Sequence, residues 1–259
     1  MKRLAVIAAL AGIIVLPFLL RPKQAALESA QDTLVVVTPH NEAIRHEFAL
    51  GFERWYRART GRTVAIDWRV LGGTSEIGRY LEGQYVAAFR DWWTSGLGRP
   101  WSMSVLTGFQ SPNLPAGAPA LEREAREAFL HSDVGCGIDV FFGGGAFDFN
   151  QQADAGRLWP SDVRARHPDW FTDAVIPQHY AGEEFWDPRD RWYGAVVSSY
   201  GIVYNRDALR RLGVSGPPRQ WDDLASPRYL GEVALCDPTK SGSIAQAFEN
   251  VIQQNMGRA

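Results

Sequence analysis

Apolar runs alternate with stretches of helical periodicity along the body of the chain. Thr33–Thr38 is a continuous apolar run, which is typical of a buried parallel strand. Thr63–Val70 is a second such run, and Gly61 before it is placed to end an intervening helix. That helix presents one apolar face at a 3.6-residue period: Ile44, Phe48, Phe52 and Trp55. This strand-helix-strand order predicts an α/β fold with a parallel sheet and right-handed crossovers.

Two glycine-bearing turns repeat the pattern further along. Leu71–Ile77 contains Gly-Gly-Thr-Ser and opens a second helix, with Thr74 or Ser75 as its predicted N-cap. Gly137–Phe142 predicts a third strand, and three glycines then lead into a helix near Phe149–Ala155. Both turns let the backbone approach a ligand closely, although tight turns alone would explain the glycines equally well.

Residues 86–135 do not follow this pattern. They are rich in aromatic residues and contain a proline- and glycine-rich stretch at 111–119. We interpret them as an insertion wrapped over the surface, with a charged helix at Leu121–Phe129. The residues there predict no chemistry, and the alternative is a docking surface with a purely structural role.

The C-terminal part begins with a long extended stretch, Trp192–Asn205. Its length predicts a strand crossing between two lobes, followed by a helix at Arg206–Leu212. Val233–Leu235 predicts one more strand, and a turn then opens a helix that Ser241 or Ser243 can cap. The apolar face of this last helix has a 3.6-residue period: Ile244, Ala247, Phe248, Val251 and Ile252.

The turn before this last helix has the composition of an anion site. Free N–H groups and the positive dipole end attract negative charge, and Gly242 allows close approach. Lys240, the only lysine after Lys23, adds a full charge at the same point. The alternative is an ordinary helix cap beside a solvated lysine.

Residues 1–30 have the order of an export signal. Lys2 and Arg3 precede an apolar run from Leu4 to Leu20, and small residues follow. A cleaved signal peptide and an uncleaved anchor both agree with this order, because a spanning helix needs about 17–25 residues. Both alternatives predict a protein exported to the periplasm.

Composition narrows the possible partners. The chain has 259 residues, 46% of them hydrophobic, which predicts one large or two modest domains. The formal charge is −2 although the leader is basic, so the body is acidic and nucleic acid is not expected as a partner. Cys136 and Cys236 each adjoin a predicted buried strand, so we expect buried free thiols rather than a disulfide.

Four motifs in this order resemble the extracellular solute-binding proteins of ABC importers. The similarity is greatest to the subgroup for ferric iron, thiamine, phosphonates and sugar or glycerate phosphates. The motifs are Asp139–Gly145, Gly201–Asn205, Trp221–Gly231 and Cys236–Ser243. The resemblance implies a type 2 periplasmic-binding-protein fold, in which two α/β lobes close on a ligand. It further implies a first lobe at residues 31–197, the start of a second at residues 198–259, and a monomer that delivers its ligand to an inner-membrane ABC permease.

The resemblance also implies where the ligand is held. The implied contacts all follow strands: His40, Asn41, Thr74, Ser75, Gly144, Gly145, Ser198, Ser199, Tyr200, Lys240, Ser241, Gly242 and Ser243. Ligands of open parallel sheets bind beyond the carboxyl ends of the strands, which agrees with this placement. Hydroxyls, N–H groups and Lys240 favour a phosphorylated or phosphonate anion. Ferric iron is the alternative ligand, with His40 and Glu76 as candidate metal ligands, and no resident cofactor is expected.

An exported α/β hydrolase is the alternative from another class. Gly72–Ser75 lacks the glycine that a nucleophile elbow places two residues after its serine, and Thr239–Gly242 does not have the residue order of a Walker loop. We therefore favour a binding protein without enzymatic activity. Members of the family continue beyond the helix at Ser243, so we expect this chain to be C-terminally incomplete, with a loosely packed second lobe and no tight ligand.

Overall fold

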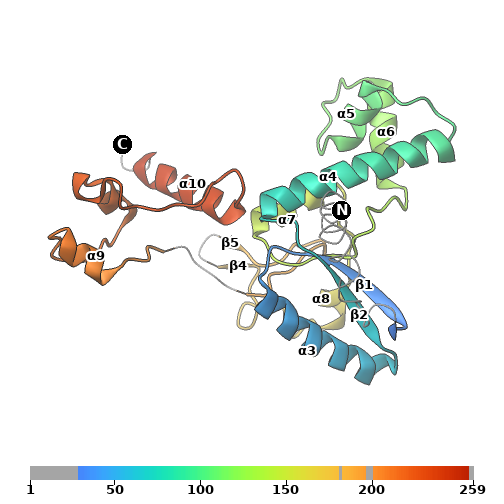
Figure 1. Cartoon of the computed structure of the whole chain (residues 1–259). Coiled ribbons are helices and arrows are strands. Elements are labelled where there is room, and N and C mark those ends of the chain that lie inside the picture. Colours follow the sequence, from blue (N-terminus) through green and yellow to red (C-terminus); the bar gives the residue numbers. More distant parts are fainter. Residues whose placement is uncertain (1–28, 181–182, 197–200, 257–259) are drawn as a thin grey trace, which may run out of the picture. The chain divides into compact units, whose positions relative to one another are not determined.

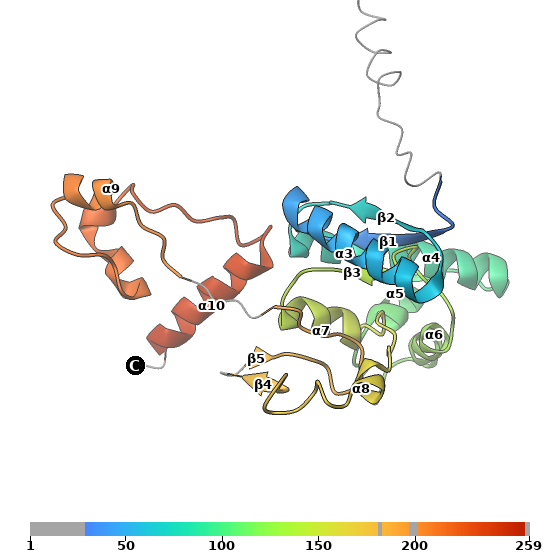
Figure 2. The ribbon, with the colours of Figure 1, turned by 90° about the horizontal axis from the view of Figure 1, so that it is seen from below.

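A computed structural model describes residues 29–180, 183–196 and 201–256, so the predicted leader lies almost wholly outside the described part. Strands β1 (Asp32–Val37), β2 (Val64–Arg69) and β3 (Val140–Phe141) form a parallel sheet in the order β2-β1-β3; β1 and β2 are labelled in Figure 1, and all three strands in Figure 2. The sheet confirms the predicted α/β class, although β3 is shorter than the predicted strand. Among the described helices, none combines the length and the hydropathy that crossing a bilayer requires.

The chain divides into two compact units, and the first consists of β1, α3 (Glu42–Thr60) and β2. Asp32 at the start of β1 accepts hydrogen bonds from the Tyr56 hydroxyl at 2.9 Å and from Nε of Arg62 at 2.6 Å. Gly61 ends α3 as predicted: its φ is 72°, and its N–H donates to the Arg57 carbonyl at 2.9 Å. The apolar face of α3 is not covered, since Trp55 is 54% exposed.

The second unit contains Val37–Asn41 and everything from Arg69 onward. Its helices include α4 (Thr74–Asp91) and α7 (Ala146–Asp154). Val37, Ile77 and Leu81 form a buried cluster that joins the end of β1 to α4. The predicted helices at these positions are therefore confirmed, and their first turns lie directly after β2 and β3.

Residues 86–135, the predicted insertion, form a helical subdomain with a core of its own, and the predicted helix at Leu121–Phe129 is confirmed. Helix α4 continues into a π-helical turn, η1 (Trp92–Gly96), and α5 (Met103–Gln110) packs against α6 (Ala120–Leu130), as Figure 1 shows. The core of this subdomain is mostly aromatic: Phe89, Trp93, Val105, Phe109, Ala125 and Phe129. Ring packing gives several of these aromatic residues a structural role: the rings of Phe89 and Phe109 lie 4.6 Å apart at 30°, and Trp92 and Trp93 also pack on Phe89.

Short elements follow α7. They are α8 (Val163–Arg166), the antiparallel pair β4 (His179–Tyr180) and β5 (Glu183–Glu184), α9 (Arg206–Arg211), the 3₁₀ turns η2 (Trp221–Ala225) and η3 (Pro227–Tyr229), and α10 (Gly242–Met256). The predicted helices at 206 and 243 are confirmed. A second sheet remains a prediction, since residues 201–256 contain no strand.

Two predicted strands are wrong within the described part of the chain. Residues 192–196 and 201–205 form only an isolated bridge between Tyr193 and Trp186, and Val233–Leu235 is irregular. A strand needs a partner to take up its backbone hydrogen bonds, and beyond the bridge at Tyr193 the described residues of these segments have no strand partner; Val203 is 99% exposed and Leu235 59%. Cys136 and Cys236 are both free, as expected, but neither is buried: Cys136 is half-buried and Cys236 is exposed.

Candidate functional site

Helices α4 and α7 begin in the same way. Each has a glycine as N-cap and a carboxylate three residues later that folds back onto the glycine N–H. Oε2 of Glu76 accepts from the Gly73 N–H, and Oδ2 of Asp148 accepts from the Gly145 N–H, both at 3.0 Å. The predicted N-cap of α4 was thus one or two residues too late, and Thr74 and Ser75 are instead its first two helical residues.

Helix α10 begins after a tight turn built on Asp237. Oδ1 of Asp237 accepts hydrogen bonds from the Thr239 N–H at 2.9 Å and from the Thr239 hydroxyl at 2.7 Å, and these bonds lower the pKa of the carboxyl. Ser241 supplies the cap, because its hydroxyl accepts from the Ile244 N–H at 3.4 Å. This confirms one of the two predicted caps; Ser243 lies inside the helix.

The three helix starts meet. A Cβ added at Gly73 would collide with the backbone carbonyl of Lys240, and one added at Gly242 would collide with the Thr74 hydroxyl. The Cβ added at Gly242 would also lie 3.0 and 3.2 Å from the two carboxylate oxygens of Asp148. A Cβ added at Gly145, at the start of α7, would lie 3.6 Å from Oε1 of Gln246 on α10; both helices are labelled in Figure 2. We call this cluster, formed by the starts of α4, α7 and α10, the three-helix cradle.

The three-helix cradle holds polar groups without partners. Oγ1 of Thr74 is buried and has no hydrogen-bond partner, which would cost about 1–3 kcal/mol if it stayed so. Within the described ranges, no hydrogen bond is found for the N–H groups of the first two residues of each helix: Thr74, Ser75, Ala146, Phe147, Gly242 and Ser243. Such N–H groups carry the positive end of each helix dipole, so the arrangement suits an anion.

The remaining predicted contacts lie in different places. The ring of His40 lies against Gly143, where an added Cβ would be 2.5 Å from Nε2, and edge-on to Phe142 with ring centres 4.8 Å apart. Burial lowers the pKa of His40, which favours the neutral ring. Lys240 is exposed, and Asn41 immediately precedes α3. Ser198, Ser199 and Tyr200 lie outside the described residues.

No metal cluster is visible in the part of the chain that the structure describes, where no three His, Cys, Asp or Glu side chains come together. Glu76, a candidate ligand for iron, is engaged in capping α4 through Oε2. His40 and Glu76 therefore have local structural partners, and the iron assignment stays an untested prediction.

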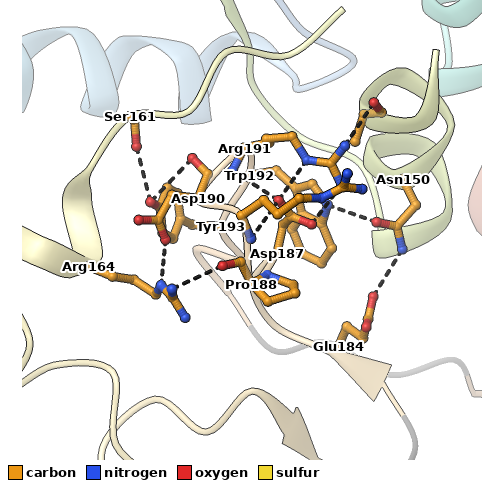
Figure 3. A network of polar contacts seen from close by, with 12 residues as sticks. Asn150, Ser161, Arg164, Glu184, Asp187, Pro188, Asp190, Arg191, Trp192 and Tyr193 are labelled. Atoms are coloured by element: carbon orange, nitrogen blue, oxygen red, sulfur yellow. Dashed lines mark hydrogen bonds and ion pairs between the residues drawn. The ribbon is translucent and has the colours of Figure 1, made fainter. Parts of the chain in front are cut away.

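A polar network anchors α7 away from its start (Figure 3). Arg191 forms a two-pronged ion pair with Asp187 at 2.7 and 2.8 Å, and it donates to the Ala153 carbonyl at 2.9 Å. This pairing lowers the pKa of Asp187. Nε1 of Trp192 donates to Oδ1 of Asn150 at 2.9 Å. The network thus fixes the helix whose first turn contributes to the three-helix cradle.

Arg126 also anchors the C-terminal end of α7, joining it to the helical subdomain. Its buried guanidinium donates to the carbonyls of Phe109, Ala155 and Asp154 at 3.0, 2.6 and 2.9 Å. Burial lowers the pKa of Arg126, but a cation beside a helix C-terminus is favourable, and the three carbonyls it contacts lie at helix ends. The sequence analysis missed both arginine anchors, because the α7 carbonyls that accept their hydrogen bonds are distant along the chain.

Parts of the chain are similar to known bacterial proteins. Residues 166–259 match the family model described as bacterial extracellular solute-binding protein. A protein of Haemophilus influenzae that has no assigned function is 30% identical over 119 residues, which is 44% of this chain and 31% of that protein. The phosphoglycerate transport regulatory protein PgtC of Salmonella typhimurium is 32% identical over 59 residues, which is 23% of this chain and 15% of PgtC. The chain thus spans less than a third of these relatives, and no solved structure matches it.

Proposed function

We propose that this protein is the periplasmic solute-binding component of an ABC importer and that it captures a phosphorylated or phosphonate small molecule. The match of residues 166–259 to the solute-binding family supports the transport role. An inner-membrane permease is then the partner that receives the ligand, and two lobes closing around a hinge are the means of capture.

The observation that carries the ligand assignment is the buried, unpartnered hydroxyl of Thr74 where the starts of α4 and α10 meet, with Asp148 of α7 facing the same Gly242. Each start contributes unpaired N–H groups and about half a positive charge. A phosphoryl or phosphonate group has three oxygens, so it can accept from several helix starts at once. Lys240 stands at the rim and adds attraction for an anion that approaches from solvent.

The relative PgtC is named for phosphoglycerate transport, which makes phosphoglycerate the first compound to test. The matched control is glycerate, which has the same carbon skeleton without the phosphoryl group. We expect phosphoglycerate to raise the melting temperature of the complete gene product and glycerate to leave it unchanged. At a ligand concentration of 100 Kd the gain in stability is about 2.7 kcal/mol.

Three results decide the proposal. A rise with phosphoglycerate or with a panel of phosphonates supports it. No rise with any phosphorylated or phosphonate compound overturns it. Release of inorganic phosphate during the incubation would instead favour the hydrolase alternative, because a binding protein returns its ligand unchanged.

A further inference from the structure

The C-terminal end of α3 is basic and carries an exposed tryptophan. Residues 54–62 contain four arginines and no aspartate or glutamate. On the last two turns of the helix, Arg54, Arg57 and Arg59 are exposed, and Trp55 is 54% exposed. We call these four residues the basic end of α3. Cations around an aromatic ring on a helix are typical of segments that lie on a bilayer surface.

The ring of Trp55 is held in place by its neighbours. The Phe52 ring stacks on it with ring centres 5.7 Å apart at 29°, and the Arg59 guanidinium lies 6.0 Å from the centre of the Trp55 ring. Phe52 also packs on Tyr56, whose hydroxyl donates to Asp32. The exposed side of Trp55 is therefore presented by a supported ring, and tryptophan favours the headgroup level of a bilayer.

The predicted leader joins the folded part of the chain at this end of α3. The Gln31 N–H donates to the Thr63 hydroxyl at 3.2 Å, and the Thr63 N–H donates to Oε1 of Gln31 at 3.1 Å. Nε of Arg62 donates to Asp32 at 2.6 Å. The apolar run of the leader ends at Leu20, and the 11 residues between it and β1 reach at most about 40 Å. A leader kept as an anchor would therefore hold the basic end of α3 near the bilayer.

We propose that the basic end of α3 docks on an anionic phospholipid surface, beside the point where the leader meets the bilayer. The arginines complement the charge of the headgroups, and the tryptophan suits the boundary between headgroups and acyl chains. A retained leader makes the contact intramolecular, so a weak attraction is enough to maintain it. This surface lies in the first unit, whereas the three-helix cradle lies in the second, so the contact with lipid does not depend on which ligand the cradle takes.

Fluorescence quenching by brominated lipid measures this contact, because bromine on the acyl chains quenches only those indole rings that reach them. The complete gene product is reconstituted with vesicles made of equal parts of brominated phosphatidylglycerol and brominated phosphatidylcholine. Residues 1–30 contain no tryptophan, so the leader itself contributes no signal. We expect the vesicles to quench the wild type and Trp55→Phe to lose this quenching. Vesicles of brominated phosphatidylcholine alone should quench the wild type much less.

Trp159→Phe is the matched control, because Trp159 is 79% exposed, more than Trp55, and lies in the second unit. It should keep the wild-type quenching. Arg54→Gln combined with Arg57→Gln tests the charge and leaves the Arg59–Trp55 contact in place. Each arginine removed should weaken the contact about fivefold, so this double variant should need more phosphatidylglycerol for the same quenching.

Absence of quenching of the wild type in the anionic vesicles overturns the proposal. Quenching that persists in Trp55→Phe overturns it as well, as does equal quenching of the wild type by the two kinds of vesicle. An unchanged lipid requirement in the double arginine variant would remove the charge complementarity and has the same consequence. A dimer that Trp55→Phe dissociates in analytical ultracentrifugation, without quenching by lipid, would assign the surface to a second copy of the chain instead.

Discussion

Gly73→Ala tests whether the contact between the α4 start and the turn before α10 belongs to the ligand-binding arrangement. The backbone of Gly73 has φ −77°, which alanine adopts freely, so the obstacle is steric alone. The atom in the way is the Lys240 carbonyl oxygen, which belongs to the backbone and cannot rotate aside as a side chain would. The turn must therefore move by about an ångström, and overpacking of this kind typically costs about 1–3 kcal/mol.

The overpacking in Gly73→Ala should reduce ligand affinity more than it reduces the free energy of unfolding. Alanine is a poorer N-cap than glycine, which removes about 1 kcal/mol from the stability of α4. The clash, in contrast, acts only on the docked arrangement, so affinity for phosphoglycerate should fall roughly 5-fold to 150-fold. Isothermal titration calorimetry measures the affinity, and a thermal melt measures the stability.

Gly83→Ala is the matched control, since Gly83 lies inside α4 and an added Cβ there meets nothing within 4 Å. Alanine at that position should raise stability by about 1 kcal/mol and leave affinity unchanged. If Gly73→Ala binds phosphoglycerate as tightly as Gly83→Ala does, the contact between the two helix starts plays no part in binding, and the reasoning is refuted.

Four further predictions follow from the anchors and the exposed segments. Lys240→Ala should weaken anion binding by about 0.5–1 kcal/mol, because the side chain is exposed, with Lys240→Arg restoring part of the loss; an unchanged affinity at low salt contradicts this. Arg126→Met should lower the free energy of unfolding by about 2–4 kcal/mol, because three carbonyls lose their donor. The control Arg90→Met, at an exposed position, should leave the free energy of unfolding unchanged. Equal effects of the two variants in a denaturant melt would contradict the prediction. The pKa of Asp187 is lowered, so its pairing with Arg191 stabilises the fold above pH about 4, and this stability is lost as the pH falls through the folded pKa. The free energy of unfolding measured from pH 5 to pH 2 should therefore fall, and Asp187→Asn should reduce that fall; identical pH profiles for the two proteins would refute this. In the 259-residue chain, amides of residues 201–239 should exchange faster than those of α4, because Val203 and Leu230 are 99% and 88% exposed; equal protection would contradict the exposure.

Local patterns in the sequence were enough to predict most elements of the first part of the chain. The apolar run at Thr33–Thr38, the glycine at 61 and the Gly-Gly-Thr-Ser turn each act through neighbouring residues, and the structure places β1, the end of α3 and the start of α4 there. The glycines at 144, 145 and 242 could be identified for the same reason, since close approach requires the absence of a side chain.

Features that depend on distant partners could not be predicted. Trp192–Asn205 has the composition of a strand, but strand formation depends on a pairing segment, and the described residues of this stretch make only an isolated bridge. Arg126 resembles any other charged helical residue in the sequence, and only the fold brings it to the end of α7. Asp148 did leave a local signal, three residues after the last glycine, which is the capping-box spacing.

The central claim is that the starts of α4, α7 and α10 bind one anion together. Backbone amide resonances of Thr74, Ala146 and Ser243, one from each helix start, report on this directly during a titration with phosphoglycerate. The account predicts that all three shift with a single apparent Kd and that glycerate shifts none of them. Saturation of phosphoglycerate binding with these three amides unmoved, or with only one of them moved, would contradict it.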